Sequence, residues 1–98
     1  MSESKSNLGI IIDTDLDTFK EDMIQRPIGQ LMSLKNLLSL KYNQVKSAST
    51  ELTNQAVKLG KQKDPKYVQT LQGMNIAMFK IEQKVLFLND RIDDLRVD

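Results

Sequence analysis

The sequence contains no cysteine and no histidine among its 98 residues. Without cysteine it can form no disulfide, no thiolate nucleophile and no cysteine-based metal site. Without histidine it lacks the usual general base near neutral pH and the commonest ligand of transition metals. The serine–histidine and cysteine–histidine arrangements of nucleophilic catalysis are excluded as well. We therefore expect a protein that is not an enzyme and that holds neither a cofactor nor a metal ion.

Two further kinds of site lack their key residues. Asp13, Asp15 and Asp17 alternate as at the start of a calcium loop, but such a loop needs glycine at its sixth position and glutamate at its twelfth. Thr18 and Ile24 occupy those positions. The four glycines are scattered along the chain, so no glycine-rich phosphate loop exists. We interpret the acidic stretch as a solvated segment that caps a nearby helix.

The net charge is only +1, which gives the whole molecule no electrostatic signature for nucleic acid or an anionic membrane. The charge is nevertheless uneven, at −4 over residues 1–22, +7 over residues 23–84 and −2 over residues 85–98. The lysines of the middle section are spread singly along a helical pattern. We interpret them as a solvated face, with a binding stripe as the alternative. Asp90, Asp93 and Asp94 are typical of an exposed final helical turn.

Long apolar runs are also missing. No stretch approaches the about eighteen apolar residues of a membrane-spanning helix. The apolar residues 8–12 are too few for the core of a signal peptide, and acidic residues follow them directly. We expect a protein made in the cytoplasm, without a membrane span and without a classical secretory route.

Residues 1–27 are predicted to form a flexible N-terminal segment. The first seven residues are polar and rich in serine, as loose termini often are. A helical turn or two can form through Phe19, Met23 and Ile24. Pro27 ends this segment or starts the next one, because proline suits the first turn of a helix and disfavours helix before it.

Residues 28–98 are predicted to form a helical hairpin. The first long helix runs from about Pro27 to Leu59, where apolar residues recur every seven positions and keep one stripe toward a partner helix. Gly60 ends this helix. The repeated apolar positions are Leu31, Leu38, Val45, Leu52 and Leu59.

The second long helix begins at the clearest local signal in the sequence. Asp64 can cap free backbone N–H groups, while Pro65 takes the first helical position. The connection from Gly60 is short enough to make the two helices antiparallel neighbours. The fold class is therefore all-α, an antiparallel two-helix hairpin that resembles a coiled coil. In the second helix, apolar residues recur every seven positions in two rows, and both rows face the first helix. These residues are Leu71, Met78, Val85 and Ile92 in one row and Met74, Ile81, Leu88 and Leu95 in the other.

The second helix carries more apolar residues than one seam requires. Ile76, Phe79, Leu86 and Phe87 lie outside both rows, and two apolar faces on one helix indicate two packing partners. These four residues are our candidate partner interface. Alternatively, the N-terminal segment folds back and covers the second face from within the chain.

Residues 64–72 resemble a pattern in the needle and inner-rod subunits of bacterial type III secretion systems. There an Asn/Asp-Pro pair begins the second helix of a short hairpin, an aliphatic residue follows three places after the proline, and a glutamine follows four places later. Val68 and Gln72 occupy those places. The tyrosines usual later in that helix are replaced here by Met78 and Phe79. The resemblance implies a subunit whose C-terminal helix packs into a helical tube, exported to the cell surface.

The sequence thus predicts a protein that binds other proteins and not nucleic acid. A self-assembling subunit of a secretion needle or filament is the first hypothesis, because the second helix has an apolar face to spare. The alternative is a small chaperone or adaptor that binds one helix of a different protein in an apolar groove.

Overall fold

The computed structural model describes residues 9–96. Within that range the chain is helical at residues 9–13 and in α2 (Leu16–Ile24), α3 (Ile28–Leu59) and α4 (Pro65–Arg96), and it contains no strand. The predicted all-α class is therefore confirmed. None of the described helices is long and apolar enough to cross a membrane. The expected loose terminus at residues 1–7 lies outside the described residues.

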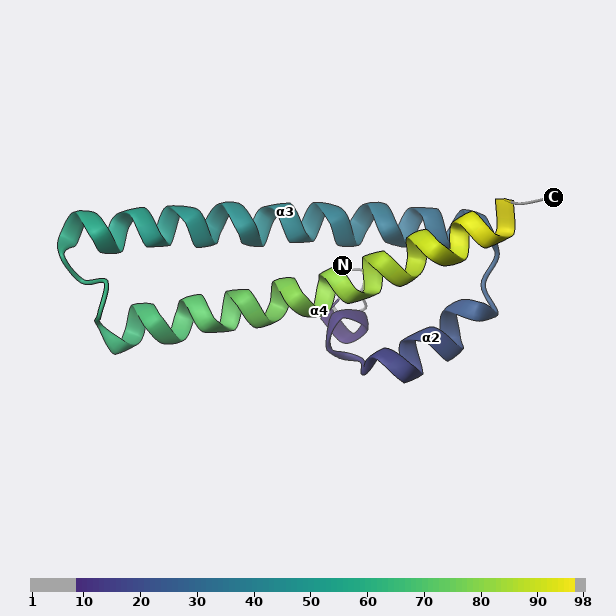
Figure 1. The fold of residues 1–98 in the computed structure, drawn as a ribbon, viewed down its shortest axis with the longest axis horizontal. Helices are drawn as coiled ribbons and strands as arrows, with labels where there is room; N and C mark the ends of the chain where they lie inside the picture. The colour runs from purple at the N-terminus through teal and green to yellow at the C-terminus, as the bar shows by residue number, and fades with distance from the viewer. Residues whose placement is uncertain (1–8, 97–98) are drawn as a thin grey trace, which may run out of the picture.

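The two long helices form the predicted antiparallel hairpin, which runs along the longest dimension of the molecule (Figure 1). Gly60 ends α3 with a φ of +68°, in the left-handed region that glycine adopts most easily. The amide of Lys61 donates to the carbonyl of Ala56 at 2.7 Å, which satisfies one of the last carbonyls of α3. The carboxylate of Asp64 accepts from the amide of Lys66 at 2.9 Å and so caps α4, as predicted.

The large side chains of the seam between α3 and α4 are deeply buried only along one half of the hairpin, and toward the turn the small Ala56 is the buried residue of α3. In the half away from the turn, Leu31 and Leu38 of α3 are packed with Ile81, Leu88 and Ile92 of α4. Toward the turn only two helices are present, so the larger seam residues are half-buried. These half-buried residues are Val45, Leu52, Leu71, Met74 and Met78.

Two predicted seam residues need correction. Leu59 and Leu95 are exposed, at 61 % and 39 % of their surface. Each is at the last turn of its helix, where the neighbouring helix no longer covers it. The seven-residue spacing therefore predicts the direction of these side chains but not the point at which the partner helix stops covering them.

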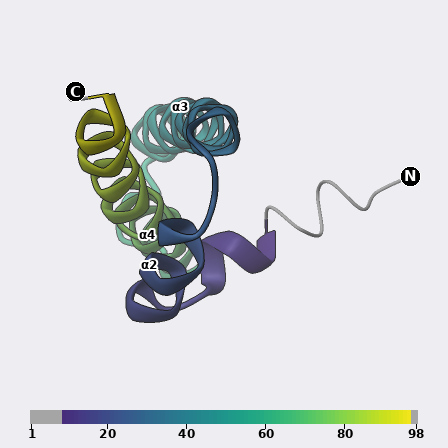
Figure 2. The same ribbon diagram turned by 90° about the vertical axis from the view of Figure 1, so that its right-hand side faces the viewer.

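The N-terminal residues 9–26 fold back against the C-terminal half of α4 (Figures 1 and 2). Phe19 and Met23 of α2 are fully buried there, together with Ile12. The ring of Phe19 meets the ring of Phe87 edge to face, with 6.2 Å between their centroids. The segment that we predicted as flexible thus supplies part of the core over these residues.

Two glycine substitutions test the turn and the helix separately. Gly60→Ala should lower the free energy of unfolding by about 1 kcal/mol, because a side chain disfavours the left-handed conformation. Gly73 lies inside α4, and an added Cβ there would meet no atom within 4 Å. Gly73→Ala should therefore raise stability by about 0.5–1 kcal/mol. Urea unfolding measures the free energy of unfolding of both variants. Equal changes of the same sign would contradict the prediction.

Candidate functional site

Helix α4 presents three different sides to its surroundings. One side packs against α3, and a second packs against residues 9–26. On a third side Ile76, Phe79 and Leu86 are 56 %, 60 % and 59 % exposed. We call these three residues the outer face. Phe79 and Leu86 are seven residues apart and therefore project from nearly the same side of the helix.

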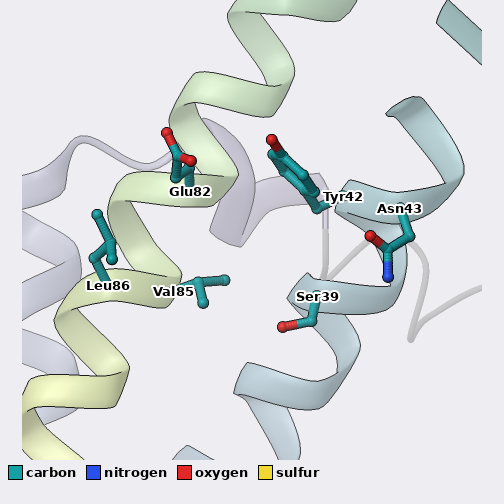
Figure 3. A pocket seen from close by; sticks show the side chains of 6 residues that line it. All are labelled: Ser39, Tyr42, Asn43, Glu82, Val85 and Leu86. Atoms are coloured by element: carbon teal, nitrogen blue, oxygen red, sulfur yellow. The ribbon is translucent and has the colours of Figure 1, made fainter. Parts of the chain in front are cut away.

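A shallow groove of about 280 Å³ runs beside the outer face, between α3 and α4. Leu86 belongs to both, because it borders the groove and is also part of the outer face. Val85 projects toward α3, where Tyr42 and Ser39 face it (Figure 3). On α4 the groove is bordered by the apolar Val85 and Leu86 and by the carboxylate of Glu82, whereas its α3 side is mainly polar. Its lining residues are Ser39, Tyr42, Asn43, Glu82, Val85 and Leu86.

Lys84 is the one charged residue buried in the described part of the chain, with only 2 % of its surface exposed. Its ammonium donates a hydrogen bond to the carbonyl oxygen of Ile12 at 2.9 Å. That carbonyl belongs to the last turn of the helical residues 9–13, where a positive charge interacts favourably with the helix dipole. The ammonium also lies 5.7 Å from the centroid of the Phe19 ring.

Arg91 makes a matching contact one heptad further along α4. Its Nη2 donates to the carbonyl oxygen of Ile24, the last residue of α2, at 3.2 Å. Lys84 thus satisfies a carbonyl at the end of the helical residues 9–13, and Arg91 satisfies one at the end of α2. These two contacts hold residues 9–26 in a defined register on α4.

Burial lowers the pKa of Lys84 below its ordinary value of 10.5, and the neighbouring charge of Lys80 lowers it further. Asp13 and Asp15 oppose this shift. Lys80 itself forms an ion pair with Asp13 at 3.8 Å. The arrangement serves packing and orientation, because the ammonium is enclosed by the chain and faces no cavity among those found in the described residues.

Our interpretation of the middle lysines as a solvated face does not hold for Lys84. A signal for its burial exists in the sequence. Lys84 lies three residues after Ile81 and four before Leu88, so it projects from the same side of the helix as these two core residues. What the spacing could not provide is the carbonyl that accepts its hydrogen bond, which comes from a residue 72 positions earlier.

The acidic stretch has the role that we predicted for it. Asp15 caps α2, accepting from the amide of Thr18 at 3.0 Å and from its hydroxyl at 2.8 Å. These hydrogen bonds lower the pKa of Asp15, because they stabilise its charged form. Within residues 9–96, no three acidic side chains gather closely enough to hold a metal ion.

The structure divides the four residues of our candidate partner interface. Ile76, Phe79 and Leu86 lie on the outer face, where no other part of residues 9–96 covers them. Phe87 instead lies inside the chain, half-buried against Phe19, with the ammonium of Lys20 5.7 Å from the centroid of its ring. The intrachain alternative therefore applies to Phe87 and not to the other three.

Comparison of the chain with known protein families, with curated proteins and with solved structures found no match.

The buried ammonium should give the protein a distinctive pH dependence. The folded state has the lower Lys84 pKa, so the unfolded state holds more protons as the pH rises toward 10.5. The free energy of unfolding should therefore rise over this range relative to a Lys84→Met variant, which keeps the apolar stem but cannot titrate.

Urea unfolding at several pH values between 7.5 and 10 measures this difference. Lys46→Met, at an exposed position of α3, is the control for the loss of one lysine elsewhere. A wild-type protein and a Lys84→Met variant with parallel pH profiles would contradict the prediction.

Proposed function

We propose that the chain is a non-enzymatic helical subunit that assembles with further copies of itself through the outer face of α4. The observation that carries the proposal is the exposure of Phe79 and Leu86, at 60 % and 59 %, on a helix already packed on two other sides. Single exposed apolar residues are common on protein surfaces. A phenylalanine and a leucine seven residues apart on one helix face are the pattern that helix pairing uses.

The position of residues 9–26 supports an intermolecular partner for this face. In the alternative that the sequence left open, this segment would cover the excess apolar residues. It is instead held on a different side of α4 by Lys84 and Arg91, with Phe19 and Met23 already buried. The outer face therefore needs a second molecule if it is to be buried.

The resemblance at residues 64–72 suggests a setting for this assembly. A needle or inner-rod subunit is a small helical hairpin whose C-terminal helix lies in a helical tube, and α4 would be that helix. In this setting the protein is a structural component of type III secretion, forms a homo-oligomer with coiled-coil-like contacts, and is exported to the cell surface.

The groove between α3 and α4 favours a second candidate function. In this groove of about 280 Å³ the apolar residues Val85 and Leu86 of α4 lie opposite the polar residues Ser39 and Asn43 of α3, and Glu82 adds a carboxylate. A partner helix could place one apolar side chain there and bond to the polar side. In this case the protein is a small chaperone or adaptor for a different protein, and it remains a monomer alone.

Substitutions on α4 test the assembly proposal. Phe79→Asp and Leu86→Asp should each weaken self-association at least tenfold, because a carboxylate would be placed in an apolar contact. Their free energies of unfolding should change by less than about 0.5 kcal/mol, as is usual for exposed positions. Val85→Asp changes the seam with α3, so it should cost about 3 kcal/mol or more.

Sedimentation velocity over a range of concentrations measures association, and circular dichroism checks the fold. Leu40→Asp, at an exposed position of α3, is the matched control and should associate like the wild type. A wild-type protein that remains a monomer at every concentration would refute self-assembly and leave the adaptor hypothesis. Equal loss of folding in all the α4 variants would show that the outer face is internal.

A further inference from the structure

Residues 9–26 cover part of α4 and join the hairpin at one short connection, Gln25 to Pro27. We call residues 9–26 the strap. Pro27 is extended, with φ −68° and ψ 157°, and proline disfavours helix in the residue before it. Helices α2 and α3 therefore do not merge into one helix. Figures 1 and 2 show the strap lying beside α4, and α4 is the helix that it mainly contacts. The strap can swing about this connection while the hairpin stays intact.

The contact between the strap and α4 combines buried apolar groups with buried charge. Ile12, Phe19 and Met23 of the strap are buried, but so is Lys84 of α4, whose ammonium bonds to the strap. The Nε of Arg91 is also buried and finds no hydrogen-bond partner within the described part of the chain. If the strap opened, water would hydrate both charged groups, and this hydration offsets part of the apolar contact that is lost. Opening the strap therefore costs less than opening an equally large apolar contact.

The seam between α3 and α4 has no such buried charge at the same level of the molecule. Its buried side chains there are all apolar, and the turn at Gly60 keeps the two long helices together. Proteins open locally where the free energy of opening is lowest. We therefore expect the strap to open before the hairpin does. The buried seam residues are Leu31, Leu38, Ile81, Leu88 and Ile92.

The strap separates Phe87 from the outer face. Phe87 is half-buried against Phe19 of the strap. Ile76 of the outer face lies eleven residues earlier, about three helical turns, so Ile76 and Phe87 project from nearly the same side of α4. Leu86 of the outer face directly precedes Phe87. When the strap opens, Phe87 therefore joins Ile76, Phe79 and Leu86 in one continuous apolar surface.

We propose that the strap is an autoinhibitory cover, which withholds Phe87 from a second copy of the chain until the strap opens. The inference rests on the proposed self-assembly and adds its regulation. A second copy is the occupant of the uncovered surface because this surface is continuous with the outer face. A closed strap lowers the apparent affinity in proportion to the fraction of molecules that are open. Locking the strap should therefore weaken association, and loosening it should strengthen association.

A cross-link tests the locked state. Asp13 of the strap and Lys80 of α4 form an ion pair at 3.8 Å, and the chain contains no cysteine. A variant with Asp13→Cys and Lys80→Cys therefore carries the only two thiols, which a short bismaleimide joins within one molecule. The control is the same variant with both thiols blocked by N-ethylmaleimide. In sedimentation velocity the linked protein should associate at least tenfold more weakly than the blocked protein.

A substitution in the strap tests the loosened state. Phe19→Ala removes the ring that packs on Phe87 and leaves α4 unchanged, so association should strengthen at least threefold. Adding Phe87→Ala should abolish this gain, whereas adding Leu40→Asp on the exposed side of α3 should preserve it. Hydrogen exchange measured by mass spectrometry reports the opening itself. The amides of α2 should exchange faster than those of residues 81–92, faster still in Phe19→Ala, and more slowly in the linked protein.

The autoinhibitory cover is overturned if the linked and blocked proteins associate equally, or if the amides of α2 exchange only together with the hairpin. Covalent dimers as the main product of the linker would also overturn it, because the strap would then lie on the α4 of another copy. In these cases the proposed function still holds as long as Phe79→Asp weakens association. A wild type that never associates refutes both. If Phe19→Ala fails to fold, the linked and blocked proteins alone decide.

Discussion

Everything in this structure depends on α4 packing against two neighbours at once. The helix meets α3 along the seam and residues 9–26 along another side, and either contact alone would leave much of its apolar surface in water. The two contacts overlap only over the C-terminal half of α4. This is where the completely buried side chains gather, among them Ile81 and Leu88, so the core has three layers there and two toward the turn.

The second neighbour is positioned by polar contacts as well as by packing. Two short helices cannot bury enough apolar surface to fix their own position. Lys84 and Arg91 supply directional bonds to carbonyls that would otherwise lack partners at the ends of these helices. Burying an ammonium is costly, as the lowered pKa of Lys84 indicates. The cost is offset by a hydrogen bond, the face of the Phe19 ring and two nearby carboxylates.

The hairpin could be predicted from sequence because its signals are local. The turn is marked by the backbone and capping preferences of Gly60, Asp64 and Pro65. The seven-residue spacing of apolar residues in each long helix determines which side of that helix faces the other helix. The position of α2 could not be predicted in the same way. It depends on contacts between residues about 70 positions apart, such as Ile12 with Lys84 and Ile24 with Arg91. The same distance in sequence explains why Phe87 was assigned to the partner interface.

The seam is less buried near the turn than in the rest of the hairpin, and this difference is a second reason, besides the outer face, why assembly would stabilise the protein. Toward the turn the seam residues Val45, Leu52 and Met74 are only half-buried, because no third element covers this part of the hairpin. A domain of this size has little stability to spare, and a partner that binds only the folded state adds its binding energy to that stability. Contacts made by a second molecule near the turn would therefore stabilise the region that the chain itself supports least. Folding of the two-layered half and association would then be coupled.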